Sequence, residues 1–247
     1  MALIAVAILG AIVGSFLNAL SFRVRTGRSV LRGRSRCMHC GTTLTAAELV
    51  PVLSYVFLRG HCRHCGTRIS AQYPLVELCA AALGAAVFAL NPAPLMFALW
   101  FVVWMTLLFT VVYDLRHFII PWSCSGLLAL LGLIHVWSLG FDFWSLAAGP
   151  LLAAPLLLLS LVSRGTWMGW GDGALQLSLG WLLGLTAGLT GLVLAFWIGA
   201  AVGIAALLGR EGYTMKSELP FAPFLVLGAG VAYFLHVDIF STLPALF

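Results

Sequence analysis

The sequence predicts an all-α protein that crosses a membrane about eight times. Hydrophobic residues make up 62% of the 247-residue chain, and charged residues make up only 9%. The mean hydropathy of +1.07 lies far above that of soluble domains. Several apolar runs also reach the roughly 18 to 20 residues that a helix needs to cross a bilayer.

The apolar runs divide the chain into successive expected spans, which are separated by polar or glycine-containing links. The sixth span is the least regular, because it is short and contains Gly180 and Gly184. It is expected either to be tilted or to form a re-entrant pair with the seventh. The expected spans cover about 2–22, 75–91, 95–113, 119–138, 144–163, 174–187, 191–209 and 221–240.

Positive charge is confined to one side of this arrangement. If the spans alternate in direction, all thirteen Lys and Arg residues fall in links on the same side. Positively charged links stay in the cytoplasm, so both chain termini are predicted to lie outside it. The net charge of +5 is thus a topology signal, and no nucleic-acid partner is expected. The basic residues are Arg23, Arg25, Arg28, Arg32, Arg34, Arg36, Arg59, Arg63, Arg68, Arg116, Arg164, Arg210 and Lys216.

Two aspartates stand out in a chain that has only eight acidic residues. Asp114 ends the third apolar run, and Asp172 closes the turn Gly169-Trp170-Gly171-Asp172. Both fall on the predicted cytoplasmic side, and two carboxyl groups can activate a shared water molecule without a metal. We therefore predict an aspartyl protease site at Asp114 and Asp172, supported by the two glycines of the turn, Gly169 and Gly171. The alternative role for Asp172 is that of a helix N-cap.

The loop between the first two spans carries a second motif, made of two CxxC pairs. Cys37 and Cys40 form the first pair, and Cys62 and Cys65 form the second. Two such knuckles supply four thiolates, which complete a tetrahedral zinc shell with no open position. The expected zinc ion is therefore structural. Disulfides are the alternative, but a cytoplasmic loop lies in a reducing environment.

Other residues of the two knuckles also have expected roles. Gly41 and Gly66 directly follow the second cysteine of each pair, where such turns need a permissive backbone. His39 and His64 lie within the knuckles and could replace a cysteine as a ligand. Histidines in this position more often lie outside the metal shell.

Short motifs occur in a fixed order along nearly the whole chain. They begin with Gly14-Ser15-Phe16-Leu17-Asn18, pass through the two cysteine pairs, and continue with Tyr73-Pro74-Leu75-Val76-Glu77. Asp114 with Ile120-Pro121 follows, then the Asp172 turn, and the series ends with Pro220-Phe221-Ala222-Pro223. In this order the motifs resemble those of the type IV prepilin peptidases.

The resemblance implies an aspartyl endopeptidase of the bacterial cytoplasmic membrane, with its active site facing the cytoplasm. Its substrates would be type IV prepilins and pseudopilins, whose short basic leaders are removed, and Asp114 and Asp172 would be the catalytic pair. Relatives that keep the four-cysteine loop typically also methylate the new N-terminal residue with S-adenosylmethionine. The implied organisation is a first transmembrane helix at 1–22, a methyltransferase-associated cytoplasmic loop at 23–74 and a transmembrane peptidase domain at 75–247.

The chain departs from the family pattern beside the second aspartate. The family usually has a hydrophobic residue and then a lysine after it, whereas this chain has Gly173 and Ala174. Trp122 stands where the family often has Asp or Asn. The main alternative function is a catalytically silent membrane protein that docks partners through its zinc loop. A transporter is a third possibility, but the position of the two aspartates near the membrane surface and the lack of charges within the spans argue against it.

Overall fold

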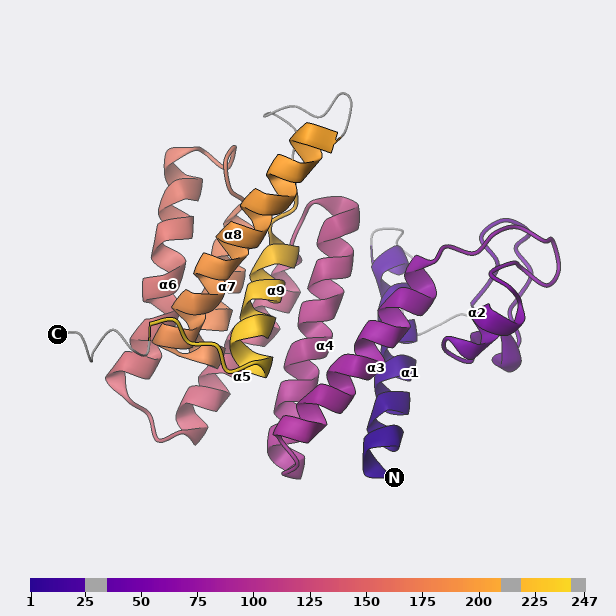
Figure 1. Cartoon of the computed structure of the whole chain (residues 1–247), viewed down its shortest axis with the longest axis horizontal. Coiled ribbons are helices and arrows are strands. Elements are labelled where there is room, and N and C mark those ends of the chain that lie inside the picture. Colours follow the sequence, from indigo (N-terminus) through magenta and orange to yellow (C-terminus); the bar gives the residue numbers. More distant parts are fainter. Residues whose placement is uncertain (25–34, 210–218, 241–247) are drawn as a thin grey trace. The chain divides into compact units, whose positions relative to one another are not determined.

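The computed structural model describes residues 1–24, 35–209 and 219–240, and helices dominate this part of the chain (Figure 1). The all-α class predicted from the sequence is thereby confirmed. The chain divides into two compact units, Met1–Val112 and Tyr113–Phe247. Part of the predicted charge asymmetry lies outside the described residues, namely Arg25, Arg28, Arg32, Arg34, Arg210 and Lys216.

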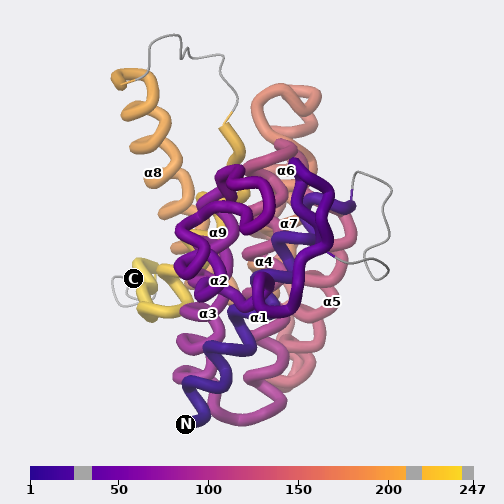
Figure 2. The backbone as a smooth tube through the Cα atoms, turned by 90° about the vertical axis from the view of Figure 1, so that its right-hand side faces the viewer, coloured from indigo at the N-terminus to yellow at the C-terminus, as the bar shows by residue number. Residues whose placement is uncertain are grey.

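The first unit contains two helices that lie side by side, α1 (Ala2–Arg23) and α3 (Gln72–Leu90), as both Figure 1 and Figure 2 show. They approach closely because α1 carries glycine at the contact: a Cβ atom on Gly14 would lie 2.6 Å from the Cβ of Ala80. Small residues allow such close packing of membrane helices. The loop that joins them includes the 3-10 helix η1 (Ala46–Leu49) and the short helix α2 (Leu53–Phe57).

Helix α4 (Pro94–His117) begins in the first unit and ends in the second. The second unit continues with α5 (Trp122–Ser138), α6 (Phe143–Val162), α7 (Trp170–Leu183), α8 (Leu185–Gly209) and α9 (Ala222–Phe234). Helix α7 packs against α5 and α6, and α8 packs against α9. Glycines again mark the contacts, since a Cβ on Gly180 of α7 would lie 2.7 Å from the Cα of Gly149 on α6.

Each expected span corresponds to a helix. By length and composition, α1, α3, α4, α6 and α8 are long and apolar enough to cross a membrane, whereas α5 and α9 are shorter apolar helices. The sixth expected span corresponds to α7, which begins at Trp170 rather than 174. This helix stops at Leu183 because Gly184 adopts φ +79° and separates α7 from α8. Helix α8 therefore begins at Leu185 rather than 191.

The last helix is shorter than expected, ending at Phe234 rather than 240. His236 adopts φ +50°, which does not continue a right-handed helix. The chain then turns toward α8, where the backbone N–H of Ile239 donates to Thr190 Oγ1 at 3.1 Å. This fully buried threonine hydroxyl thus anchors the segment that follows α9.

Candidate active site and metal centre

Asp114 lies in the last turn of α4 and is 4% exposed. Its carboxyl group accepts a hydrogen bond from the backbone N–H of Ala222, the first residue of α9. The other carboxyl oxygen, Oδ2, is buried and has no hydrogen-bond partner among the described residues. The N-terminus of α9 therefore holds Asp114 in place while one of its oxygens stays available.

Asp172 lies in the first turn of α7 and is 9% exposed. Gly169 is the N-cap residue, and its backbone N–H donates to Asp172 Oδ2 at 3.2 Å. The alternative role of Asp172 as the N-cap is therefore wrong: it occupies the third helical position and bonds back to the cap. Gly169 also keeps the turn tight, because a Cβ there would lie 3.3 Å from that carboxyl oxygen.

The two aspartates come together within the second unit. Their carboxyl groups lie close enough to interact electrostatically. The link that follows α4 touches the turn that carries Asp172, because a Cβ on Gly171 would lie 2.9 Å from the Cβ of Ile120. Gly171 thus leaves room for the side chain of Ile120. The structure thus brings two buried carboxyl groups, from positions far apart in the sequence, within electrostatic reach of each other.

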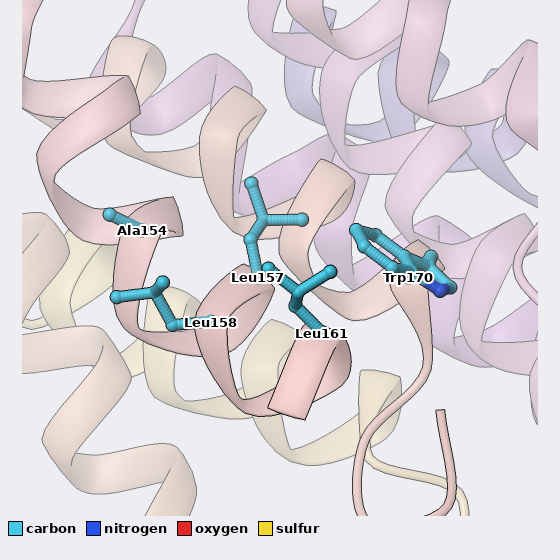
Figure 3. Close-up of a pocket in the computed structure, with 5 residues that line it drawn as sticks. All are labelled: Ala154, Leu157, Leu158, Leu161 and Trp170. Carbon is cyan, nitrogen blue, oxygen red and sulfur yellow. The ribbon is translucent and has the colours of Figure 1, made fainter. Parts of the chain in front are cut away.

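An apolar hollow of about 320 Å³ lies near this turn but does not belong to the carboxyl site (Figure 3). Positions two apart on a helix point about 200° away from each other, so Trp170 and Asp172 face different sides of α7. Within the described part of the chain, no acidic or basic group lines the hollow. Its lining residues are Ala154, Leu157, Leu158 and Leu161 of α6 and Trp170 of α7.

The four cysteines of the loop form a compact cluster, as predicted. Their Sγ atoms all lie within 4.8 Å of one another, and those of Cys37 and Cys65 are 3.8 Å apart. A tetrahedral zinc shell with bonds of about 2.3 Å places its sulfurs about 3.8 Å apart. All four are free thiols, so the disulfide alternative is not realised. The residues Cys37, Cys40, Cys62 and Cys65 fit a four-thiolate metal site.

The two knuckles have the same local structure. The backbone N–H of Gly41 donates to the carbonyl of Cys37 at 3.0 Å, and that of Gly66 donates to Cys62 at 2.9 Å. The two glycines adopt φ +71° and +70°, which confirms that these positions need a permissive backbone. Each knuckle therefore forms by local hydrogen bonds, and the second repeats the first.

Threonines beside the knuckles favour the thiolate form that binds metal. Thr42 Oγ1 lies 3.3 Å from Cys40 Sγ, and Thr67 Oγ1 lies 3.4 Å from Cys65 Sγ. Hydrogen bonding with Thr42 lowers the pKa of Cys40, and hydrogen bonding with Thr67 lowers the pKa of Cys65 to about 6. The thiolate, not the thiol, is the metal ligand. Neither knuckle histidine belongs to the sulfur cluster.

Two residues at the carboxyl site were not predicted from the sequence. Ala222 contributes only a backbone N–H, and its one sequence signal is the pair of prolines that flank the start of α9. Gln176 lies one helical turn after Asp172 and is 1% exposed. A polar residue inside the apolar run of α7 was the signal that could have identified it.

Fold and sites define the class: an α-helical, multi-pass membrane protein with two buried, interacting carboxyl groups and a four-cysteine metal-binding arrangement. The family model for the bacterial peptidase A24 N-terminal domain matches residues 8–90. A prepilin leader peptidase/N-methyltransferase of Burkholderia pseudomallei (strain 1026b) is 34% identical over 259 residues, covering 92% of this chain and 83% of the relative. No solved structure matches the chain.

A second relative, the prepilin leader peptidase/N-methyltransferase of Bacillus subtilis (strain 168), is 33% identical over 247 residues. That match covers 95% of this chain and 94% of the relative. The chain therefore belongs to the prepilin leader peptidase/N-methyltransferase family. The resemblance read from its ordered motifs is confirmed.

Proposed function

We propose that the protein is an aspartyl endopeptidase that removes the leader peptides of type IV prepilins and pseudopilins, and that it methylates the new N-terminal residue. The observation that carries the peptidase proposal is the buried, interacting pair Asp114 and Asp172. The names of the relatives support the substrate class and both activities.

The chemistry follows from two carboxyl groups that share one site. Both cannot ionise easily, because like charges at short distance repel, so the pair retains one proton. The ionised carboxylate accepts a proton from water as the water attacks the scissile carbonyl. The protonated carboxyl group donates to the carbonyl oxygen or to the leaving amine.

Each carboxyl group is held at the N-terminus of a helix, where negative charge is favoured. Asp114 is held by the start of α9 through Ala222, and Asp172 is held by the start of its own helix through Gly169. Only one oxygen of Asp114 is used for this purpose. The pair is thus oriented by the backbone and still has lone pairs available for water.

The position of the pair suits a substrate that is partly embedded in lipid. Asp114 lies where α4 ends and Asp172 where α7 begins, so both are at helix ends rather than at the centre of a span. We infer that these ends lie at the cytoplasmic surface of the inner membrane, following the side assigned to the basic links. A prepilin presents its cleavage point there, between a basic leader and an apolar helix.

The four-cysteine loop would hold a structural zinc ion through Cys37, Cys40, Cys62 and Cys65, whose spacing matches a tetrahedral shell. A closed shell of four thiolates leaves no position for substrate, so the ion would shape the loop only. We assign residues 23–74 to methyl transfer and residues 75–247 to peptidase activity, with S-adenosylmethionine as methyl donor and the first helix at 1–22 as an anchor in lipid.

The proposal is tested by incubating purified enzyme with a prepilin in detergent. Asp114→Asn and Asp172→Asn should each reduce cleavage by about 100-fold or more, because each removes an acid–base group. Asp142→Asn is the matched control, since this exposed aspartate only caps α6 by accepting from Trp144 N at 3.1 Å. Unchanged cleavage in either site variant would exclude the pair, and an inactive wild type would favour the docking alternative.

A further inference from the structure

Helix α2 presents an exposed apolar face. Leu53, Val56 and Phe57 are 55%, 62% and 82% exposed. Their spacing of three and four residues places them on the same side of a helix. Apolar side chains gathered in this way on a loop between two membrane helices indicate a surface that another apolar phase covers.

A hydrogen bond ties this helix to a membrane-spanning one. The backbone N–H of Val52, directly before α2, donates to Glu77 Oε2 on α3 at 2.7 Å, and Glu77 is 6% exposed. Val52 adopts φ +61°, which a β-branched residue rarely does, so this bond holds an otherwise unfavourable turn. The start of α2 is thereby tied to the N-terminal part of α3 within the first unit.

We propose that the α2 face of Leu53, Val56 and Phe57 lies in the lipid interface next to α1 and α3. Exposed arginines follow directly, at Arg59 and Arg63. An apolar face with adjacent basic residues is the pattern of a helix that lies in the plane of a membrane, with its cations at anionic headgroups. The metal loop would then be held against the membrane surface as well as by its two flanking helices.

Photo-crosslinking in bilayer nanodiscs that contain phosphatidylglycerol tests this proposal. Benzoylphenylalanine is introduced at Phe57 or Leu53, and at His39 as an exposed control in the first knuckle of the same loop. We expect phospholipid adducts at both α2 positions, several-fold above the control, in protein with wild-type metal content. Adducts no more frequent than at the control would overturn the proposal, as would predominant crosslinking to another segment of the chain or to added prepilin.

A separate observation concerns Gln176, one helical turn after Asp172 and therefore on the same side of α7. The side chain is 1% exposed, yet its Nε2 atom has no hydrogen-bond partner within the described part of the chain. Buried polar groups are nearly always paired, so an amide left unpaired beside a reactive carboxyl group needs a reason.

We further propose that the Gln176 amide donates a hydrogen bond to a backbone carbonyl of the bound prepilin. This inference rests on the proposed peptidase function. An extended substrate strand carries carbonyl oxygens past the carboxyl pair, and binding would pair the amide that is unpaired in the free enzyme. Substrate binding would thus remove the energetic cost of burying an unpaired amide.

Gln176→Leu separates this role from a structural one. Because the variant removes a buried unpaired polar group, its thermal stability in detergent should equal or exceed that of the wild type, while kcat/KM for prepilin cleavage should fall roughly 10- to 100-fold. Prepilin affinity is also compared between Asp172→Asn and Asp172→Asn/Gln176→Leu, where the second variant should bind about tenfold more weakly. Unchanged kcat/KM, or a joint loss of stability and activity, would overturn the role without affecting the carboxyl pair.

Discussion

The carboxyl site and the metal site are built in opposite ways. The carboxyl groups come from α4 and α7, are fixed by the start of α9, and are buried by packing of the second unit. The four cysteines come from two repeated turns, and each turn closes by hydrogen bonds within a few residues. Damage to helix packing should therefore affect cleavage, whereas damage to the turns should affect metal binding.

Removing a metal ligand should produce the largest difference in effect between the two sites. Cys62→Ser should abolish stoichiometric zinc, because three thiolates no longer close the shell, and methyl transfer should be lost with it. Prepilin cleavage should persist, since the carboxyl pair lies in the second unit. Metal analysis and both activity assays check this, with the exposed Cys79→Ser as control. Retained zinc in the Cys62 variant would contradict the four-thiolate site.

Gly171→Ala should reduce prepilin cleavage and leave zinc binding intact, which is the converse of the Cys62→Ser effect. The new methyl group would lie 2.9 Å from the Cβ of Ile120, which is not the flexible end of a side chain, so the turn that carries Asp172 must shift. Misplacement of a reactive group by about 1 Å can cost about 100-fold in rate. Cleavage should therefore fall by up to about that factor, with zinc content unchanged.

Gly126→Ala is the matched control for this change. No atom lies within 4 Å of a Cβ at this glycine of α5, so that variant should cleave prepilin like the wild type. Equal cleavage by the Gly171 and Gly126 variants would show that the contact with Ile120 does not position the carboxyl pair.

The same contrast explains what the sequence could predict. The CxxC spacing encodes a local turn, so the grouping of the four cysteines can be predicted from short-range pattern alone. The apolar runs predicted the helices. Because the chain has only eight acidic residues, Asp114 and Asp172 could be recognised as candidate site residues. The partner of Asp114 could not be inferred in this way, because the N–H of Ala222 is a backbone group that every residue except proline carries. Its role depends on the packing of α9.

Packing also accounts for one departure from the family pattern, the glycine at position 173. A Cβ at this glycine would overlap the side chain of Leu157 on α6, with its Cγ only 2.7 Å away. Leu157 thus occupies the space that a larger residue after Asp172 would need. Gly173→Leu should therefore lower the free energy of unfolding by about 1 to 3 kcal/mol through overpacking.

A double variant tests that explanation. Gly173→Leu combined with Leu157→Ala should recover most of the lost stability, because the shortened side chain on α6 makes room. Thermal unfolding in detergent measures both proteins. Additive destabilisation in the double variant would mean that Leu157 is not the group that excludes a side chain at position 173.

Glu77 provides the smallest and most local test. Glu77→Ala removes the acceptor for Val52 N–H and should weaken attachment of the loop to α3 by about 1 kcal/mol, or about fivefold in its opening. Limited trypsin cleavage after Arg59 and Arg63 should rise accordingly, while Glu77→Gln, which keeps an oxygen acceptor, should stay near the wild type. Zinc content should not change, because no cysteine depends on this bond. If the metal were lost as well, the knuckles would depend on α3, and the distinction between a locally built and a packed site would fail.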